Sequence, residues 1–174
     1  MKKMVNVKES EVLRTKKIMF RGKMFEIQLT KKMEEDIRQE VRVAKLNGWG
    51  FDTCLQRCPY GICDDWQEEV ARVWSEMEVS VEVGEKATLN LWSDRRAMTV
   101  TKVISQRKVE VMENNTICKD WYASSYEILP ELIGRPMVFT LRKGGTWIEE
   151  GQPKKYGSVS ITLGFRHHYI DPNF

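Results

Sequence analysis

The stretch SVEVGEKATLNLW (residues 80–92) decides the fold, because apolar and polar residues alternate along it around one glycine. An apolar residue at every second position is typical of a β-strand with one buried face. The alternation recurs in AMTVTKVIS (97–105) and KVEVMEN (108–114), with turn residues between the runs. About five or six short strands of this kind predict a small antiparallel barrel or sandwich, such as an SH3-like barrel, over residues 79–174.

The end of the chain continues this strand pattern. VFTLRKGGTWIEEG (138–151) predicts a hairpin that turns at Gly144-Gly145, because glycines allow a tight turn. SVSITLGFRHHYI (158–170) again alternates apolar and polar residues and adds one or two more strands. The strand pattern therefore continues to about residue 170.

Upstream of residue 79, the sequence predicts a β-hairpin followed by a helix. KKIMFRGKMFEIQL (16–29) has apolar residues on both sides of Gly22, which allows the turn of a hairpin. TKKMEEDIRQEVRVAKLNG (30–48) spaces its apolar residues three or four apart, so they share one face of a helix. Thr30 is the expected N-cap of this helix, and Gly48 is its expected C-terminal cap.

A second helix is predicted over DDWQEEVARVWSEM (64–77), with Asp64 or Asp65 as the capping residue. Residues 49–63 are expected to form the loop between the helices, and the helices are expected to pair as a hairpin. The fold class is therefore α+β. We expect an N-terminal module of a β-hairpin and two helices at residues 1–78, and a barrel at residues 79–174.

The charge is unevenly distributed along the chain, although the formal net charge is only +3. Residues 1–33 carry ten basic and three acidic residues, whereas residues 34–87 carry six basic and thirteen acidic residues. Two interpretations remain open. The basic arm binds an anionic partner such as nucleic acid, or it folds against the acidic segment.

Three of the four cysteines lie in CLQRCPYGIC (54–63). A metal site here would need a fourth ligand, for instance Cys118 or Asp64, because structural zinc is bound by four ligands. The spacing matches neither paired CxxC knuckles nor common iron–sulfur patterns. We therefore favour thiols that pack a loop, and we expect no metal and no cofactor.

No catalytic constellation stands out in the sequence. His167 and His168 are adjacent, so on a strand they would point to opposite faces. Nothing places Ser93 and Asp94 beside a histidine, and KGGTW (143–147) lacks the spacing of a phosphate-binding loop. We expect that the protein is not an enzyme.

Basic residues interleaved with aromatic residues form the clearest candidate site in the strand region. Arginine and lysine bind phosphates, and aromatic rings stack on bases. The alternative is that the aromatic residues belong to the core and the cations are solvated. The candidate residues for binding nucleic acid or a nucleotide are Trp92, Arg95, Arg96, Arg142, Lys143, Trp147, Lys154, Lys155, Tyr156, Arg166 and His168.

The C-terminal half resembles a family of small, mostly uncharacterised proteins encoded by bacteriophages and prophages of Gram-positive bacteria. The matching pieces are VGEKATLNLWSDRRAMTVTKV (83–103), FTLRKGGTWIEEG (139–151) and the ending LGFRHHYIDPNF (163–174). The resemblance implies an SH3-like β-barrel and an accessory role, such as regulating host processes or blocking host defence. The first 78 residues lie outside the family pattern.

Together these features predict a non-enzymatic phage accessory protein that binds and inhibits a host defence complex, for example an anti-CRISPR protein. The expected partner is a host defence protein or ribonucleoprotein in the host cytoplasm. No membrane partner is expected, because no apolar run is long enough to span a bilayer. Acidic residues of the helices would contact a basic groove of the partner. These residues are Glu34, Glu35, Asp36, Glu40, Glu68, Glu69 and Glu76.

Three other functions remain open at this level. The basic arm and barrel loops could form a nucleic-acid-binding module, whose affinity would fall steeply with salt. A pocket lined by arginine and aromatic residues could capture a nucleotide signal of host immunity. The protein could also be a small component of the virion.

Overall fold

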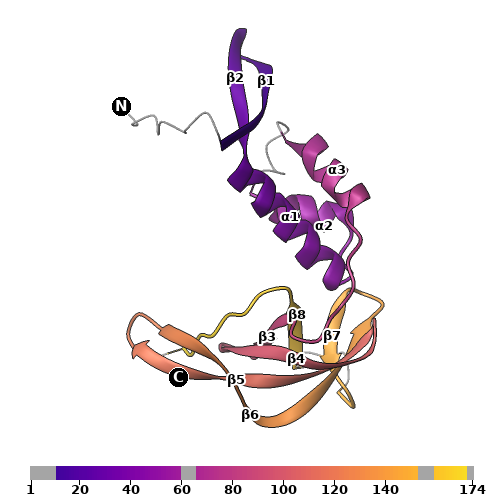
Figure 1. The fold of residues 1–174 in the computed structure, drawn as a ribbon, viewed down its shortest axis with the longest axis vertical. Helices are drawn as coiled ribbons and strands as arrows, with labels where there is room; N and C mark the ends of the chain where they lie inside the picture. Colours follow the sequence, from indigo (N-terminus) through magenta and orange to yellow (C-terminus); the bar gives the residue numbers. More distant parts are fainter. Residues whose placement is uncertain (1–10, 60–65, 153–158, 172–174) are drawn as a thin grey trace. The chain divides into compact units, whose positions relative to one another are not determined.

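The computed structural model describes residues 11–59, 66–152 and 159–171. The chain forms two compact units (Figure 1). The first unit runs up to Val41 and continues from Phe51 to Met77, and the second contains Arg42–Gly50 and the chain from Glu78 onwards. The division falls inside one helix, whereas the sequence predicted a single boundary between residues 78 and 79.

The first unit begins with the predicted hairpin. Strand β1 (Val12–Phe20) pairs antiparallel with strand β2 (Lys23–Thr30). Arg21 and Gly22, between the strands, have φ angles of 48° and 74°. Two consecutive residues with positive φ are typical of a type I′ turn, whose twist matches that of the paired strands.

Helix α1 (Lys31–Leu46) has both predicted caps. The amide of Met33 donates a hydrogen bond to Oγ1 of Thr30 (3.3 Å), which satisfies one of the free donors at the helix start. At the other end, the amide of Gly48 bonds to the carbonyl of Lys45 and that of Trp49 to the carbonyl of Ala44. This pair of bonds, with a φ of 65° at Gly48, is a Schellman motif.

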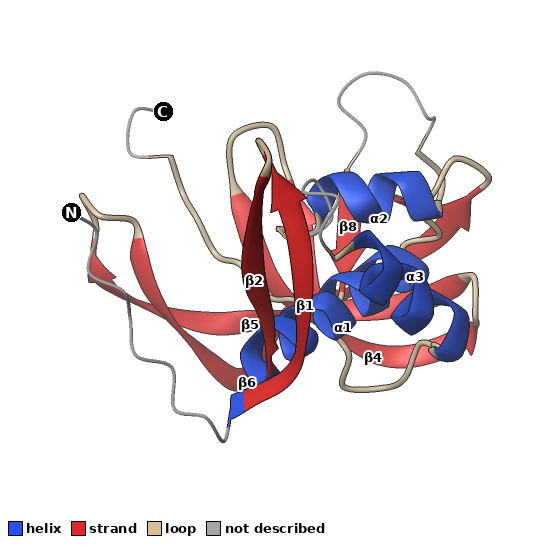
Figure 2. Ribbon diagram, turned by 90° about the horizontal axis from the view of Figure 1, so that it is seen from above, coloured by secondary structure: helices blue, strands red, loops and turns tan. Residues whose placement is uncertain are grey.

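Two further helices follow, so the prediction of a plain loop over residues 49–63 and of a two-helix hairpin is wrong. Figure 2 shows the helices in blue. Helix α2 (Phe51–Arg57) lies within the expected loop, and helix α3 (Gln67–Glu76) begins later than expected. The predicted capping residues 64 and 65 lie outside the described residues. No helix in the described ranges is long and apolar enough to cross a membrane.

The second unit contains a six-stranded antiparallel sheet that closes on itself, because the first strand pairs with both the second and the last. This arrangement, called the closed sheet below, confirms the antiparallel strands expected after residue 79. The strands are β3 (Lys86–Asn90), β4 (Arg95–Ser105), β5 (Lys108–Asp120), β6 (Ser125–Arg142), β7 (Thr146–Glu149) and β8 (Ser160–Leu163).

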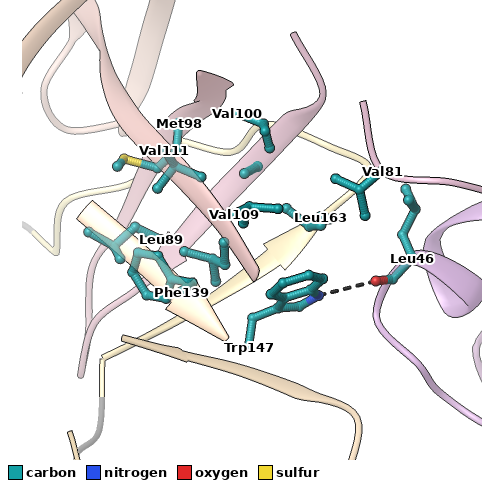
Figure 3. Close-up of a cluster of buried hydrophobic side chains, with 12 residues drawn as sticks. Leu46, Val81, Leu89, Met98, Val100, Val109, Val111, Phe139, Trp147 and Leu163 are labelled. Carbon is teal, nitrogen blue, oxygen red and sulfur yellow. Dashed lines mark hydrogen bonds between the residues drawn. The ribbon is translucent and has the colours of Figure 1, made fainter. Parts of the chain in front are cut away.

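The core of the closed sheet is filled by side chains from alternate strand positions (Figure 3). Phe139 and Trp147 are its largest fully buried side chains. The indole Nε1 of Trp147 donates a hydrogen bond to the carbonyl of Leu46 (3.1 Å). This carbonyl lies at the end of α1, where carbonyls have no partner within the helix. The buried indole therefore has the polar partner that it needs.

Residues 42–50 pack on the strands of the second unit through polar contacts as well. The side chain of Asn47 is buried, and its Nδ2 donates to the carbonyl of Leu163 (3.0 Å). The amide of Leu163 donates to Oδ1 of Asn47 (2.9 Å). A Cβ atom on Gly164 would lie 2.7 Å from Cγ2 of Val43, so only glycine fits this contact.

Strands β5 and β6 extend beyond the closed sheet as a two-stranded ribbon. Pairing between β4 and β5 ends at Met98 and Glu113, whereas β5 and β6 remain paired up to Asp120 and Ser125. Figure 1 shows this hairpin projecting from the sheet. The sequence pattern had indicated no strand between residues 115 and 137, so the ribbon is a finding of the structure.

Candidate functional site

The acidic residues expected to contact a partner form an ion-pair cluster within the first unit. The guanidinium of Arg72 lies between the carboxylates of Glu34, Glu69 and Glu76. These carboxylates hold the pKa of Arg72 above its usual value, chiefly through the hydrogen bond to Glu69. Three of the seven predicted contact residues are therefore engaged in ion pairs within the protein.

The other acidic residues are spread over two helices. Glu35 and Glu68 are exposed, and Asp36 and Glu40 are partly buried. Glu69 is only 5% exposed, and its Oε2 accepts a bond from Nη1 of Arg14 (2.8 Å). This contact joins the basic arm to the acidic segment, as the second interpretation of the charge pattern expected.

Several of the predicted basic and aromatic residues bond within the second unit. Trp147 is fully buried, so its ring cannot stack on a base. Arg95 donates from Nη1 to the carbonyls of Leu91 and Asp94. Arg96 pairs with Glu113 at 3.3 Å.

Arg166 and His168 follow strand β8, and their side chains contact strands β4 and β6 respectively. Arg166 donates to the carbonyl of Met98 (3.2 Å) and to Oγ1 of Thr99 (2.7 Å). The ring of His168 lies 4.6 Å from the ring of Tyr126, and its buried Nδ1 has no hydrogen-bond partner among the described residues. Burial lowers the pKa of His168, so the imidazole is neutral at pH 7 and cannot bind phosphate as a cation.

The remaining predicted basic residues do not share a surface with Trp92. Arg142 and Lys143 are exposed in the turn between β6 and β7, where β6 ends. Trp92 lies in the turn that precedes β4, and in an antiparallel sheet this is the opposite end of the strands. Lys154, Lys155 and Tyr156 lie outside the described residues.

The end of the closed sheet that carries Trp92 exposes a group of large aromatic side chains. Trp92 is 86% exposed, Trp121 is 47% exposed and Tyr122 is 93% exposed. Trp121 and Tyr122 belong to the turn between β5 and β6, which lies at the same end as the turn between β3 and β4. We call Trp92, Trp121 and Tyr122 the aromatic end.

The C-terminal segment joins the two turns of the aromatic end. Arg95 and Tyr169 exchange two backbone hydrogen bonds of 2.7 and 2.8 Å. The amide of Asp171 donates to Oδ1 of Asp94 (3.1 Å), next to Trp92 in the chain. Oγ of Ser124 donates to the carbonyl of Ile170 (3.2 Å), so the same segment also supports the turn of the ribbon.

Charges near the aromatic end are balanced. Lys119 pairs with Glu127 across the ribbon at 2.6 Å, and Arg96 pairs with Glu113. Two of the cations near the exposed rings are thus paired with carboxylates, and Arg95 is bonded to backbone carbonyls. A nucleic-acid site would be expected to show a patch of unpaired cations.

The sequence interpretation included Trp92 but missed Trp121 and Tyr122. A signal was present, because DWYASS (120–125) places two aromatic residues where small or turn-forming residues usually lie. Aromatic residues in a tight turn cannot reach the core and are therefore exposed.

Cys54 and Cys58 lie in and just after helix α2 and are both buried. Burial raises the pKa of the Cys54 thiol to about 11, so it stays protonated at neutral pH. Cys63 lies outside the described residues. Within the described ranges, no group of three or more potential ligands is placed to hold a metal ion.

Comparison of the chain with family models, with characterised proteins and with solved structures finds no match. The described residues form a β-hairpin, three helices and a closed antiparallel sheet. The aromatic end is the feature of this fold that most clearly has the character of a binding surface.

Proposed function

We propose that the protein is a non-enzymatic binding protein that engages a protein partner through its aromatic end. The observation that carries this proposal is the exposure of Trp92 and Tyr122 on turns that the C-terminal segment fixes in place. Tryptophan and tyrosine dominate the binding energy of many protein interfaces, because they bury a large area with few rotatable bonds.

The balanced charge around the aromatic end favours a protein over nucleic acid as the partner. Interface cores are depleted in charged residues and enriched in aromatic residues. Nucleic-acid sites depend on unpaired lysine and arginine for most of their affinity. Here Arg95, Arg96 and Arg166 are engaged by carbonyl, carboxylate and hydroxyl groups of the chain itself.

The resemblance of the C-terminal half to phage proteins supports a more specific form of the proposal. In this form the closed sheet is an SH3-like barrel, and the chain is a phage accessory protein in the host cytoplasm. It inhibits a host defence protein or ribonucleoprotein by occupying a surface that the complex needs, as an anti-CRISPR protein does. The exposed acids Glu35 and Glu68 are then the helical residues best placed for an additional contact.

The proposal is tested by expressing the tagged protein in its host and identifying what co-purifies at low and at high salt. The double variant Trp92→Ala/Tyr122→Ala removes both exposed rings. Ile104→Ala is the matched control, because Ile104 is exposed at the opposite end of β4. A defence protein retained at high salt by the wild type and the control, and lost by the double variant, would support the proposal.

Two outcomes would contradict it. Nucleic acid alone, lost at high salt, would favour the nucleic-acid-binding module instead. A defence protein bound equally by the double variant would show that another surface makes the contact. Charge reversal at Glu35 and Glu68 would then test the acidic helices.

A further inference from the structure

The first unit contains a pocket of about 360 Å³ between strand β1 and the start of helix α3. Arg14, Thr15 and Lys16 line it from the strand, and Trp66, Glu68, Glu69 and Arg72 line it from the helix side. This volume lies at the lower end of the range of small-molecule sites. The pocket is separate from the aromatic end, which belongs to the second unit.

The local structure explains why these side chains meet. Residues two apart on a strand point to the same face, so Arg14 and Lys16 project together while Lys17 points to the other face. Residues three apart on a helix are neighbours, so Glu69 and Arg72 also lie on one face. The two sets meet through the contact between Arg14 and Glu69.

The pocket is lined by three cations, Arg14, Lys16 and Arg72, and by two carboxylates, Glu68 and Glu69. Oε2 of Glu69 accepts from Arg14 (2.8 Å), and Oε1 accepts from Nε of Arg72 (3.1 Å), so both oxygens of the buried carboxylate are engaged. The ammonium of Lys16 lies 5.2 Å from the ring centre of Trp66, and no described carboxylate forms an ion pair with it. The Arg14 side chain is 56% exposed and uses only Nη1 toward Glu69 in the described contacts.

We propose that this pocket binds a small molecule that carries a phosphate group and a flat ring, for which a mononucleotide is the simplest probe. The N–H groups of Lys16 and Arg14 would bind the phosphate oxygens through charge-assisted hydrogen bonds. The indole of Trp66 is only 9% exposed, and the part of it that lines the pocket would contact the ring of the ligand. This site uses none of the residues of the aromatic end, although Glu68, which lines it, is also one of the two acids proposed for an additional partner contact.

The experiment is a calorimetric titration of the full-length protein with AMP, with adenosine and with inorganic phosphate. We expect AMP to bind with one site per chain and adenosine to bind at least about tenfold more weakly, because it lacks the charged group. Inorganic phosphate alone should also bind more weakly than AMP, because it makes no contact with Trp66. Comparable binding of phosphate and AMP would overturn the role of the ring and show a simple anion site.

Variants assign the binding to this pocket. Lys16→Gln should weaken AMP binding by about tenfold or more, because it removes a charge-assisted hydrogen bond. Lys17→Gln is the matched control on the opposite face of β1 and should bind as the wild type does. Arg14→Gln removes the partner of a buried carboxylate, so its folding is checked first by circular dichroism.

Three results would overturn the proposal. They are no detectable binding of AMP at concentrations up to about 1 mM, equal affinity for AMP and adenosine, and an unchanged affinity in Lys16→Gln. None of them would bear on the aromatic end, whose test uses Trp92 and Tyr122.

Discussion

Replacing Asn47 by alanine should destabilise the second unit strongly. Strand β7 pairs with β8 only at Ile161 and Ser160, so no strand covers the outer edge of Leu163. The amide and carbonyl of Leu163 instead bond to the buried side chain of Asn47 at 2.9 and 3.0 Å. In Asn47→Ala both backbone groups would remain buried without partners.

The magnitude follows from these two bonds. A buried polar group that loses its partner costs about 1–3 kcal/mol, so the two groups together should cost about 2–6 kcal/mol of the free energy of unfolding. For a chain of this size each kcal/mol lowers Tm by about 2–4 °C, so Tm should fall by about 4–24 °C. Urea unfolding followed by tryptophan fluorescence measures the loss directly, since Trp147 is buried in the same unit.

The control is Asn115→Ala. Asn115 also bonds through its amide, to Oε2 of Glu131 at 2.9 Å, but the pair is exposed. Water replaces this bond, so we expect a loss below about 0.5 kcal/mol. A loss below about 1 kcal/mol in Asn47→Ala would refute the reasoning, because it would show that water or a rearranged strand satisfies Leu163.

Three further predictions concern reactivity, pH and packing. Iodoacetamide labelling followed by peptide mass spectrometry should modify exposed Cys118 quickly and Cys54 slowly, because burial raises the pKa of the Cys54 thiol to about 11; equal rates would contradict this. Burial lowers the pKa of His168 below 6.5, so unfolding takes up a proton. The neutral imidazole therefore contributes its full stabilisation of the folded state above pH 6.5. This contribution is lost as the pH falls through the lower pKa of the folded state. Tm should therefore drop more between pH 7 and about pH 5 in the wild type than in His168→Gln, and parallel curves would disprove it. Gly164→Ala should cost about 2–4 kcal/mol in urea unfolding, because φ is +103° and the new methyl group would clash with the end of α1. Gly22→Ala, which has positive φ but open space around it, should cost only about 1 kcal/mol, and a similar loss in both variants would exclude the clash.

Much of the fold could be predicted because local rules and tertiary packing agree. Thr30 and Gly48 have the side chain or the backbone freedom that a helix end needs, and both caps are present. The alternation of residues 80–92 matches a strand with one buried face, and Ala87 and Leu89 are indeed buried. Helix α2 was missed because it is too short to show a helical period.

The candidate site was harder to predict, because exposure depends on the tertiary structure. Trp92 and Trp147 are alike in a sequence pattern of basic and aromatic residues. One is exposed in a turn, and the other fills the core. Likewise, the charge of Arg72 gives no indication that three carboxylates from two helices surround it. Only the arrangement of the elements shows which side chains remain available to a partner.

The contact between Asn47 and Leu163 also has a consequence for synthesis on the ribosome. The two residues are 116 positions apart in the chain. Strand β8, which contains Leu163, is the last of the described strands to be synthesised. At about 5–20 residues per second, the end of helix α1 waits about 6–23 s before its partner strand is made. During this time the buried side chain of Asn47 lacks the amide and the carbonyl of Leu163 as partners. The second unit is therefore completed only when the last strand leaves the ribosome.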